Sequence, residues 1–173
     1  MPYSLPQLPP DVLQDLNSPS LMILRNRVIA NVDRMIAMAG SADRLRPHCK
    51  THKMPAAVEL RLDRGVTRHK AATIAEAEML AAAGAPDVLL AYNPVGPNIR
   101  RIVRLLQQFP QCRFSVTADH EQPLRQLSEA SEAAGVHVTV LLDINVGMGR
   151  TGVEPDSDVA RSLLQLIESL PGT

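Results

Sequence analysis

The strongest constraint on the fold is a repeat of an apolar run, a polar tip and a helical pattern, at a spacing of roughly 25 residues. Five such units are present, over residues 45–64, 66–84, 87–109, 113–134 and 137–170. Strands that alternate with helices at this spacing are typical of a parallel sheet, because parallel strands need a crossover connection between them. The repeat therefore predicts an α/β fold in which helices cover a parallel sheet.

Two architectures fit this repeat, a doubly wound sheet and a (β/α)8 barrel. Both place ligand sites at the carboxyl ends of the strands, and here those ends carry polar side chains at residues 48–52, 69–70, 92–93, 117–119 and 143–145. Five successive polar ends, with no GxGxxG motif after the first strand, favour the barrel. Because a barrel needs eight units, we predict a partial (β/α)8 TIM barrel with about five units in this chain.

The residues before the repeat have a different character. Residues 1–17 are rich in proline and form an arm or a short helical cap, whereas residues 18–173 form the barrel portion. Within that portion, the apolar run at residues 20–24 predicts a strand. Residues 27–39 carry apolar side chains at helical spacing and predict a helix.

Charge and composition exclude several classes of partner. The chain has 18 basic and 18 acidic residues, two Tyr, two Phe and no Trp. Proteins that bind nucleic acid or anionic membranes need a basic excess, and base-stacking platforms need aromatic rings. Two cysteines outside any CxxC pair fit a reducing compartment, and no apolar run reaches the length of a signal peptide core or membrane helix. We therefore expect a cytoplasmic protein whose partner is a small molecule.

The first unit carries the most reactive combination of side chains. Alternation along a strand predicts that His48, Lys50 and His52 share one face. Positively charged neighbours or burial favour the neutral amine, which is the nucleophile that a Schiff-base lysine requires. An exposed basic strand end without chemistry is the alternative interpretation. Residues 44–70 contain eight Lys and Arg and only two acidic residues, which a phosphate-bearing ligand would explain.

A glycine-rich loop, NVGMGRTGV, follows the fifth predicted strand. Its glycines permit positive φ and a close approach of the backbone to a ligand. Arg150 lies within this loop, where a guanidinium could hold a phenolate or carboxylate oxygen. The loop therefore marks a second candidate part of the same site.

Other titratable residues predict structural roles. Thr73 is a candidate N-cap for the helix that begins near residue 74, and Glu76 and Glu78 fit its first turn as capping and solubilising residues. His69 and His120 are expected at the surface. The sequence contains no HExxH motif or similar ligand spacing, so we expect no metal ligands in this chain.

Four segments together resemble a known family. They are RPHCKTHK, ATIAEAEML, DVLLAYNPVGPN and LLDINVGMGRTGV, and the apolar run near residue 20 matches the strand that usually opens that family's fold. The resemblance is to the fold-type III pyridoxal-phosphate enzymes, in the D-threonine aldolase and D-serine dehydratase branch, which contains the alanine racemase N-terminal domain.

The resemblance implies roles for four residues. Lys50 would hold pyridoxal 5'-phosphate as an internal aldimine, and Arg150 would lie near the phenolic oxygen of the cofactor. His48 and His52 would lie close to the cofactor. The implied reaction is that of a lyase on a D-3-hydroxy amino acid.

The resemblance also implies parts that this chain does not supply. Enzymes of this family are roughly twice as long and carry a C-terminal β-domain, which in this branch contributes a divalent metal site for Zn or Mn. Neither that domain nor the metal ligands can be matched here. A homodimer is the expected assembly of the full-length protein. Two alternatives stay open, an amino-acid racemase of the same fold and a non-catalytic cofactor-binding fragment.

Overall fold

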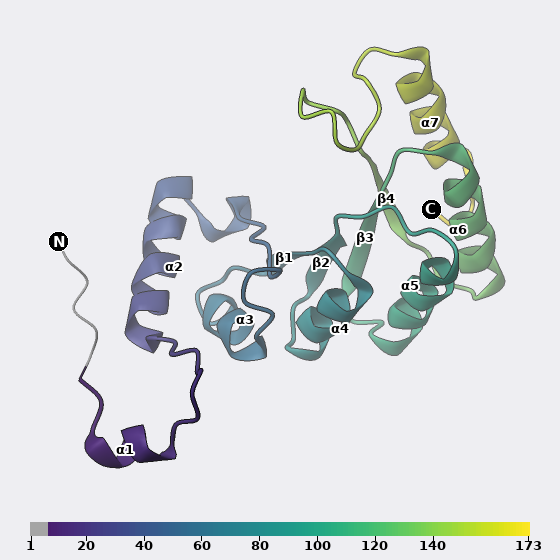
Figure 1. Cartoon of the computed structure of the whole chain (residues 1–173). Coiled ribbons are helices and arrows are strands. Elements are labelled where there is room, and N and C mark those ends of the chain that lie inside the picture. Colours follow the sequence, from purple (N-terminus) through teal and green to yellow (C-terminus); the bar gives the residue numbers. More distant parts are fainter. Residues whose placement is uncertain (1–6) are drawn as a thin grey trace.

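The computed structural model describes residues 7–173, and its centre is a four-stranded parallel sheet (Figure 1). The strands follow one another in chain order as β1 (Arg68–Ala71), β2 (Asp87–Leu90), β3 (Arg113–Ala118) and β4 (Thr139–Leu142). Each neighbouring pair is parallel. The prediction of a parallel α/β fold made of successive strand–helix units is confirmed.

A helix follows each strand, as the repeat predicts. These helices are α4 (Ile74–Ala82), α5 (Pro97–Gln108), α6 (Glu121–Ala133) and α7 (Asp158–Ser169). Local signals set their ends: the Thr73 side chain accepts a hydrogen bond from the Glu76 amide at 3.2 Å, and Pro97 occupies the first turn of α5. Gly84 follows α4 with φ +88°, where a residue with a side chain would be strained.

Four further elements precede the sheet. They are α1 (Pro10–Asp15), α2 (Arg25–Ala39), the short 3-10 helix η1 (Ala42–Arg44) and α3 (Pro55–Leu62). Helix α1 lies within the predicted arm, of which residues 1–6 lie outside the described part of the chain. Helix α2 packs against α3, and an ion pair of 2.9 Å joins Asp33 to Arg64.

The prediction of a strand at residues 20–24 is wrong. These residues pair with no other strand among residues 7–173, and Leu21 is 82% exposed. A strand exists only where its backbone N–H and C=O groups meet those of a neighbour. The apolar run has the right composition, but the described chain offers it no partner.

The two faces of the sheet differ in chemistry. One face packs against the helices (Figure 1) and holds the apolar core, with Ala71, Val88, Leu90, Phe114, Val116, Ala118 and Val140 all buried. On the other face the register aligns a largely polar row, His48, Lys70, Leu89, Ser115 and Thr139. In a closed barrel this second face would line the interior, so the polar row lies on the side where a barrel builds its site.

Among residues 7–173, no helix is long and apolar enough to cross a membrane.

His69 departs from its expected surface position. Alternation along β1 turns its side chain to the helix face, where it is fully buried. Neither ring nitrogen has a hydrogen-bond partner in the described structure. Burial and the nearby Arg61 guanidinium lower the pKa of His69 to about 4, so the ring is neutral near pH 7.

We predict that His69 makes the fold sensitive to acid. The folded-state pKa of His69 lies below the unfolded value of about 6.5, so between these two values the unfolded state takes up a proton that the folded state does not. The unfolding free energy is therefore highest above pH 6.5 and decreases as the pH falls toward 4. Between pH 7 and pH 5, His69 should cost about 2 kcal/mol of unfolding free energy. Urea unfolding at the two pH values should show this loss in the wild type and a smaller loss in His69→Leu. An equal loss in both proteins would contradict the assignment.

Candidate active site

The segment with the candidate lysine enters the sheet and then turns away from it. The Cys49 amide donates to the Lys70 carbonyl at 3.0 Å, and the Lys70 amide donates to the Pro47 carbonyl at 2.9 Å. After Cys49 the ladder ends. The amides of His52 and Lys53 donate to the Cys49 carbonyl, at 3.1 and 2.8 Å, and close a turn over residues 50–53.

This turn corrects the prediction that His48, Lys50 and His52 lie on one strand. Only a single bridge, between His48 and Lys70, has strand character. The chain has to reverse direction before α3 begins at Pro55, and the turn accomplishes this with Lys53 at φ +48°. His48, Lys50 and His52 therefore do not share one face of a strand.

Lys50 lies at the start of the turn, at the carboxyl end of the sheet. Its side chain is exposed, and no carboxylate pairs with it among the described residues. Its backbone amide donates to His48 Nδ1 at 3.1 Å. The structure thus brings Lys50 and His48 together by a local hydrogen bond and leaves the lysine amine open to a ligand.

His48 is half-buried beside Lys50 and shares the polar row with Lys70. Burial, followed by the charges of Lys70 and Lys50, lowers the pKa of His48. In the neutral ring the proton lies on Nε2, because Nδ1 accepts the Lys50 amide. His48 therefore presents an N–H group next to the candidate lysine.

His52 is directed toward α3 instead. Its Nδ1 accepts from the Met54 amide at 3.1 Å, and its Nε2 lies 2.9 Å from Arg61 Nη1. Burial and then the Arg61 charge lower the pKa of His52. These contacts give His52 a role in joining the turn to α3.

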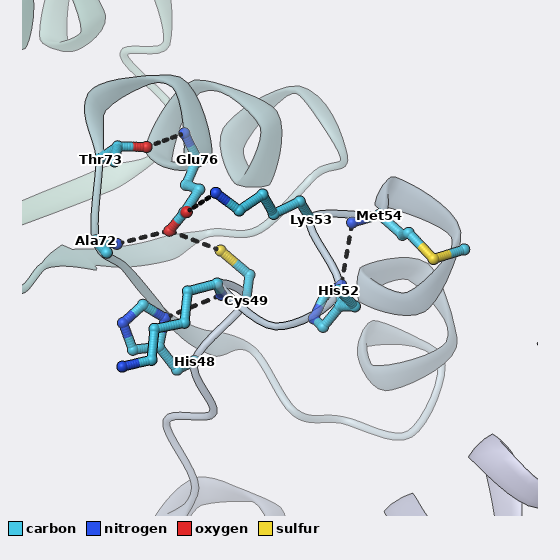
Figure 2. A network of polar contacts seen from close by, with 9 residues as sticks. His48, Cys49, His52, Lys53, Met54, Ala72, Thr73 and Glu76 are labelled. Atoms are coloured by element: carbon cyan, nitrogen blue, oxygen red, sulfur yellow. Dashed lines mark hydrogen bonds and ion pairs between the residues drawn. The ribbon is translucent and has the colours of Figure 1, made fainter. Parts of the chain in front are cut away.

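Glu76 is the residue around which the site is organised, and Figure 2 shows its contacts. The side chain is 4% exposed. Oε2 accepts from the Ala72 amide at 2.7 Å and from Cys49 Sγ at 3.7 Å, and Oε1 forms an ion pair with Lys53 Nζ at 3.0 Å. The prediction that Glu76 is a solubilising residue is wrong, because the first turn of α4 directs it under the 50–53 turn.

The contacts of Glu76 also determine the charges in this cluster. Burial alone would raise the pKa of Glu76, but the Ala72 amide and the Lys53 ammonium together lower it below its ordinary value. Burial and the adjacent Glu76 carboxylate raise the pKa of Cys49 to about 11. At neutral pH Glu76 is therefore a carboxylate that faces a Cys49 thiol.

His48, Cys49 and Glu76 are also the one group of metal-ligand types that comes together within residues 7–173. One donor atom from each lies within 4.8 Å of the others. Nitrogen, sulfur and carboxylate oxygen donors suit Zn²⁺. To bind it, however, Cys49 would have to lose its proton, and burial with the adjacent Glu76 carboxylate disfavours the thiolate. The Lys53 ammonium of the chain itself already balances the Glu76 carboxylate.

The local basic excess is partly neutralised elsewhere. Arg46 pairs with Asp87 at the amino end of the sheet, and Arg64 pairs with Asp33 on α2. Lys50 and Lys70 lie near the carboxyl end instead, on the polar side. These two lysines are therefore placed to meet an anionic ligand at the carboxyl end of the sheet, whereas Arg46 and Arg64 are not.

The glycine-rich loop after β4 is held by two polar side chains. Asn145 Oδ1 accepts from the amides of Gly147 and Gly149, at 3.1 and 2.9 Å. Asp119, at the end of β3, accepts from the Gly152 amide at 3.1 Å and from Asn93 Nδ2 at 2.9 Å. Asp119 thereby joins the polar ends of β2 and β3 to the loop.

Arg150 is exposed within this loop. No contact joins it to Lys50, His48 or His52 in the described part of the chain. The structure therefore brings together only the residues of the first unit. Arg150 lies on a separate loop, which is also at the carboxyl end of the sheet.

Sequence reasoning missed Glu76 and Asp119 as site residues. The signal for Glu76 was present, since an N-cap threonine three residues earlier fixes where the first helical turn directs its side chains. The signal for Asp119 was its position directly after a buried strand. Neither pattern reveals which backbone amides the carboxylate will meet.

Comparisons with known proteins agree with this fold. The family model for the alanine racemase N-terminal domain matches residues 23–173. A D-threonine aldolase from Arthrobacter is 34% identical over 96% of this chain and 44% of its own length. A D-threo-3-hydroxyaspartate dehydratase from Delftia is 26% identical over 84% of this chain and 38% of its own.

A solved structure extends the similarity to three dimensions. The crystal structure of a D-threonine aldolase from Filomicrobium marinum superposes with a TM-score of 0.82 at 34% identity, covering 92% of this chain and 43% of that one. The chain thus spans less than half the length of the relatives it matches.

We predict that Gly152 is indispensable to the loop, whereas Gly147 tolerates a side chain better. Both have positive φ, +90° and +99°, which costs alanine about 1–3 kcal/mol at either position. A Cβ at Gly152 would lie 2.7 Å from the Asn145 nitrogen, whereas one at Gly147 meets nothing within 4 Å. Gly152→Ala should therefore lose about 1–3 kcal/mol more than Gly147→Ala in urea unfolding. Equal losses would show that the close approach is absent.

Proposed function

Because the chain belongs to the alanine racemase N-terminal domain family, we propose that it is the N-terminal part of a pyridoxal-phosphate-dependent lyase that acts on D-3-hydroxy amino acids. In this proposal residues 18–173 form the first part of the cofactor-binding barrel, and a C-terminal β-domain completes the enzyme. The D-threonine aldolase and D-threo-3-hydroxyaspartate dehydratase among its relatives support this class of reaction.

The observation that carries the proposal is the position of Lys50. Its amine is exposed at the carboxyl end of the sheet, beside a half-buried imidazole and on a turn held by a buried carboxylate. This environment fits a lysine that forms a Schiff base with the cofactor aldehyde, because the amine is accessible while the backbone beneath it is fixed. Lys70 on the polar row adds positive charge that suits a phosphate ester.

Each residue of the site then has a defined task. Pyridoxal phosphate, when bound, withdraws electrons from the substrate carbon that carries the amino group. Lys50 holds the cofactor and His48 lies beside it as a hydrogen-bond donor, whereas His52 braces the turn against α3. Arg150 is assigned to the phenolic oxygen of the cofactor. Asp119 anchors the loop that carries Arg150 and so keeps the guanidinium at the carboxyl end of the sheet.

The remaining parts of the proposal concern the complete protein. A divalent metal, Zn or Mn, would be supplied by the C-terminal part, and the enzyme would act as a homodimer in the cytoplasm on a small D-amino acid. A racemase of the same fold is the second candidate. The lyase is favoured because the relatives include an aldolase and a dehydratase.

We predict that borohydride reduction of the complete, cofactor-loaded protein will fix the cofactor on Lys50. Reduction converts a Schiff base into a stable secondary amine, so peptide mass spectrometry can locate it. Lys50→Ala should lose the Schiff-base absorption band near the visible edge. Lys70→Ala should keep this band at saturating cofactor, because Lys70 offers a charge for the phosphate and not the amine of the Schiff base. Labelling of Lys53 or Lys70 in the wild type would contradict the assignment of Lys50.

We also predict that the complete protein cleaves or dehydrates D-3-hydroxy amino acids and does not racemise alanine. An aldolase would release glycine and acetaldehyde from D-threonine, and a dehydratase would release a 2-oxo acid and ammonia. Chiral chromatography after incubation with D-threonine, D-serine and both alanine enantiomers separates these outcomes. Interconversion of the alanine enantiomers as the principal reaction would favour the racemase.

A further inference from the structure

We propose that the ion pair between Lys53 and Glu76 is a positioning device that sets the conformation of the 50–53 turn and thereby the place of the Lys50 amine. This inference rests on the proposed function of Lys50. It assigns Lys53 and Glu76 as positioning residues, which act on the cofactor through Lys50 and not by touching it.

The Glu76 side chain contacts all three parts of the site's framework. It accepts from the Ala72 amide where β1 ends, from Cys49 where the ladder ends, and from Lys53 where the turn ends. Figure 2 shows these contacts converging on one carboxylate. Because α4 carries Glu76, a helix packed on the sheet fixes both ends of the turn.

The backbone of Lys53 gives an independent indication. Its φ of +48° is a backbone conformation that residues other than glycine, asparagine and aspartate rarely adopt. A glycine would occupy this place at less steric cost. A lysine here gains something that glycine lacks, which is an ammonium 3.0 Å from a buried carboxylate.

The two partners of this pair are unequally exposed, and this determines its strength. Lys53 is 62% exposed in its side chain and Glu76 only 4%. An exposed pair is worth little, but removal of the lysine would leave a buried carboxylate short of a partner, which is much more costly. The cluster would then have to open to water or take up a proton.

Lys50 depends on this framework because it has little support of its own. Its backbone amide donates to His48 Nδ1, and its side chain is exposed. The position of the amine is therefore determined by the backbone between Cys49 and Lys53. Attack on an aldehyde is sensitive to such positioning, since small misplacements of a reacting group reduce rates steeply.

The test compares four variants of the complete protein. Lys53→Asn removes the ammonium with a residue that tolerates positive φ, and Lys53→Arg keeps a cation. Glu76→Gln removes the carboxylate charge. Arg125→Gln, which breaks the exposed pair with Glu121 on α6, is the matched control.

Two measurements are made on each variant. Hydrogen exchange of the His52 and Lys53 amides, which donate to the Cys49 carbonyl, reports the order of the turn without cofactor. Stopped-flow absorption reports the rate at which pyridoxal phosphate forms a Schiff base with Lys50. In Lys53→Asn and Glu76→Gln, exchange should be about tenfold faster and Schiff-base formation about tenfold slower. Lys53→Arg should restore both values, and Arg125→Gln should match the wild type.

Specific results would overturn the inference. Unchanged exchange in Lys53→Asn would show that the ion pair does not order the turn. Faster exchange with an unchanged rate of Schiff-base formation would make the pair structural only. If the wild type forms no Schiff base on Lys50, the proposed function fails, and the role of the Lys53–Glu76 pair toward the cofactor fails with it. The hydrogen-exchange rates still decide whether the pair orders the turn. Should Glu76→Gln fail to fold, the exposed Lys53 variants decide the question.

Discussion

A carboxylate inside a protein stays charged only when hydrogen-bond donors or cations surround it, and this constraint on Glu76 determines the form of the site. The Ala72 amide, the Cys49 thiol and the Lys53 ammonium meet it from three parts of the chain. Each of these groups is thereby fixed relative to α4. The turn that carries Lys50 has its shape because its two ends are held by one buried charge.

The same principle operates further along the carboxyl end of the sheet, after β3 and β4. Asp119 accepts hydrogen bonds from Asn93 and from Gly152, and so joins the ends of β2 and β3 to the glycine-rich loop. One acidic residue thus supports the turn with Lys50, and another supports the loop with Arg150. The reactive side chains are left exposed while the backbone beneath them is anchored, which is the arrangement that a cofactor site requires.

The sequence predicts the elements better than it predicts the site. The helices after each strand follow from apolar spacing with Thr73, Pro97 and Gly84 at their ends, because these are local effects. The turn at 50–53 could not be predicted from alternation, since it depends on Glu76, more than twenty residues away. The burial of His69 could not be predicted, because tertiary packing decides which face of a strand the helices cover. The motif predicts Lys50 as a site residue, but it does not predict the residues that support its turn.

The most direct test of the assignment of Lys50 is a crystal structure of the complete protein grown with pyridoxal phosphate. We expect continuous electron density between Lys50 Nζ and the cofactor aldehyde carbon, with Arg150 near the phenolic oxygen. Glu76 should keep its contacts with Ala72, Cys49 and Lys53. A cofactor joined to a different lysine, or bound away from the carboxyl ends of the strands, would contradict the proposed site.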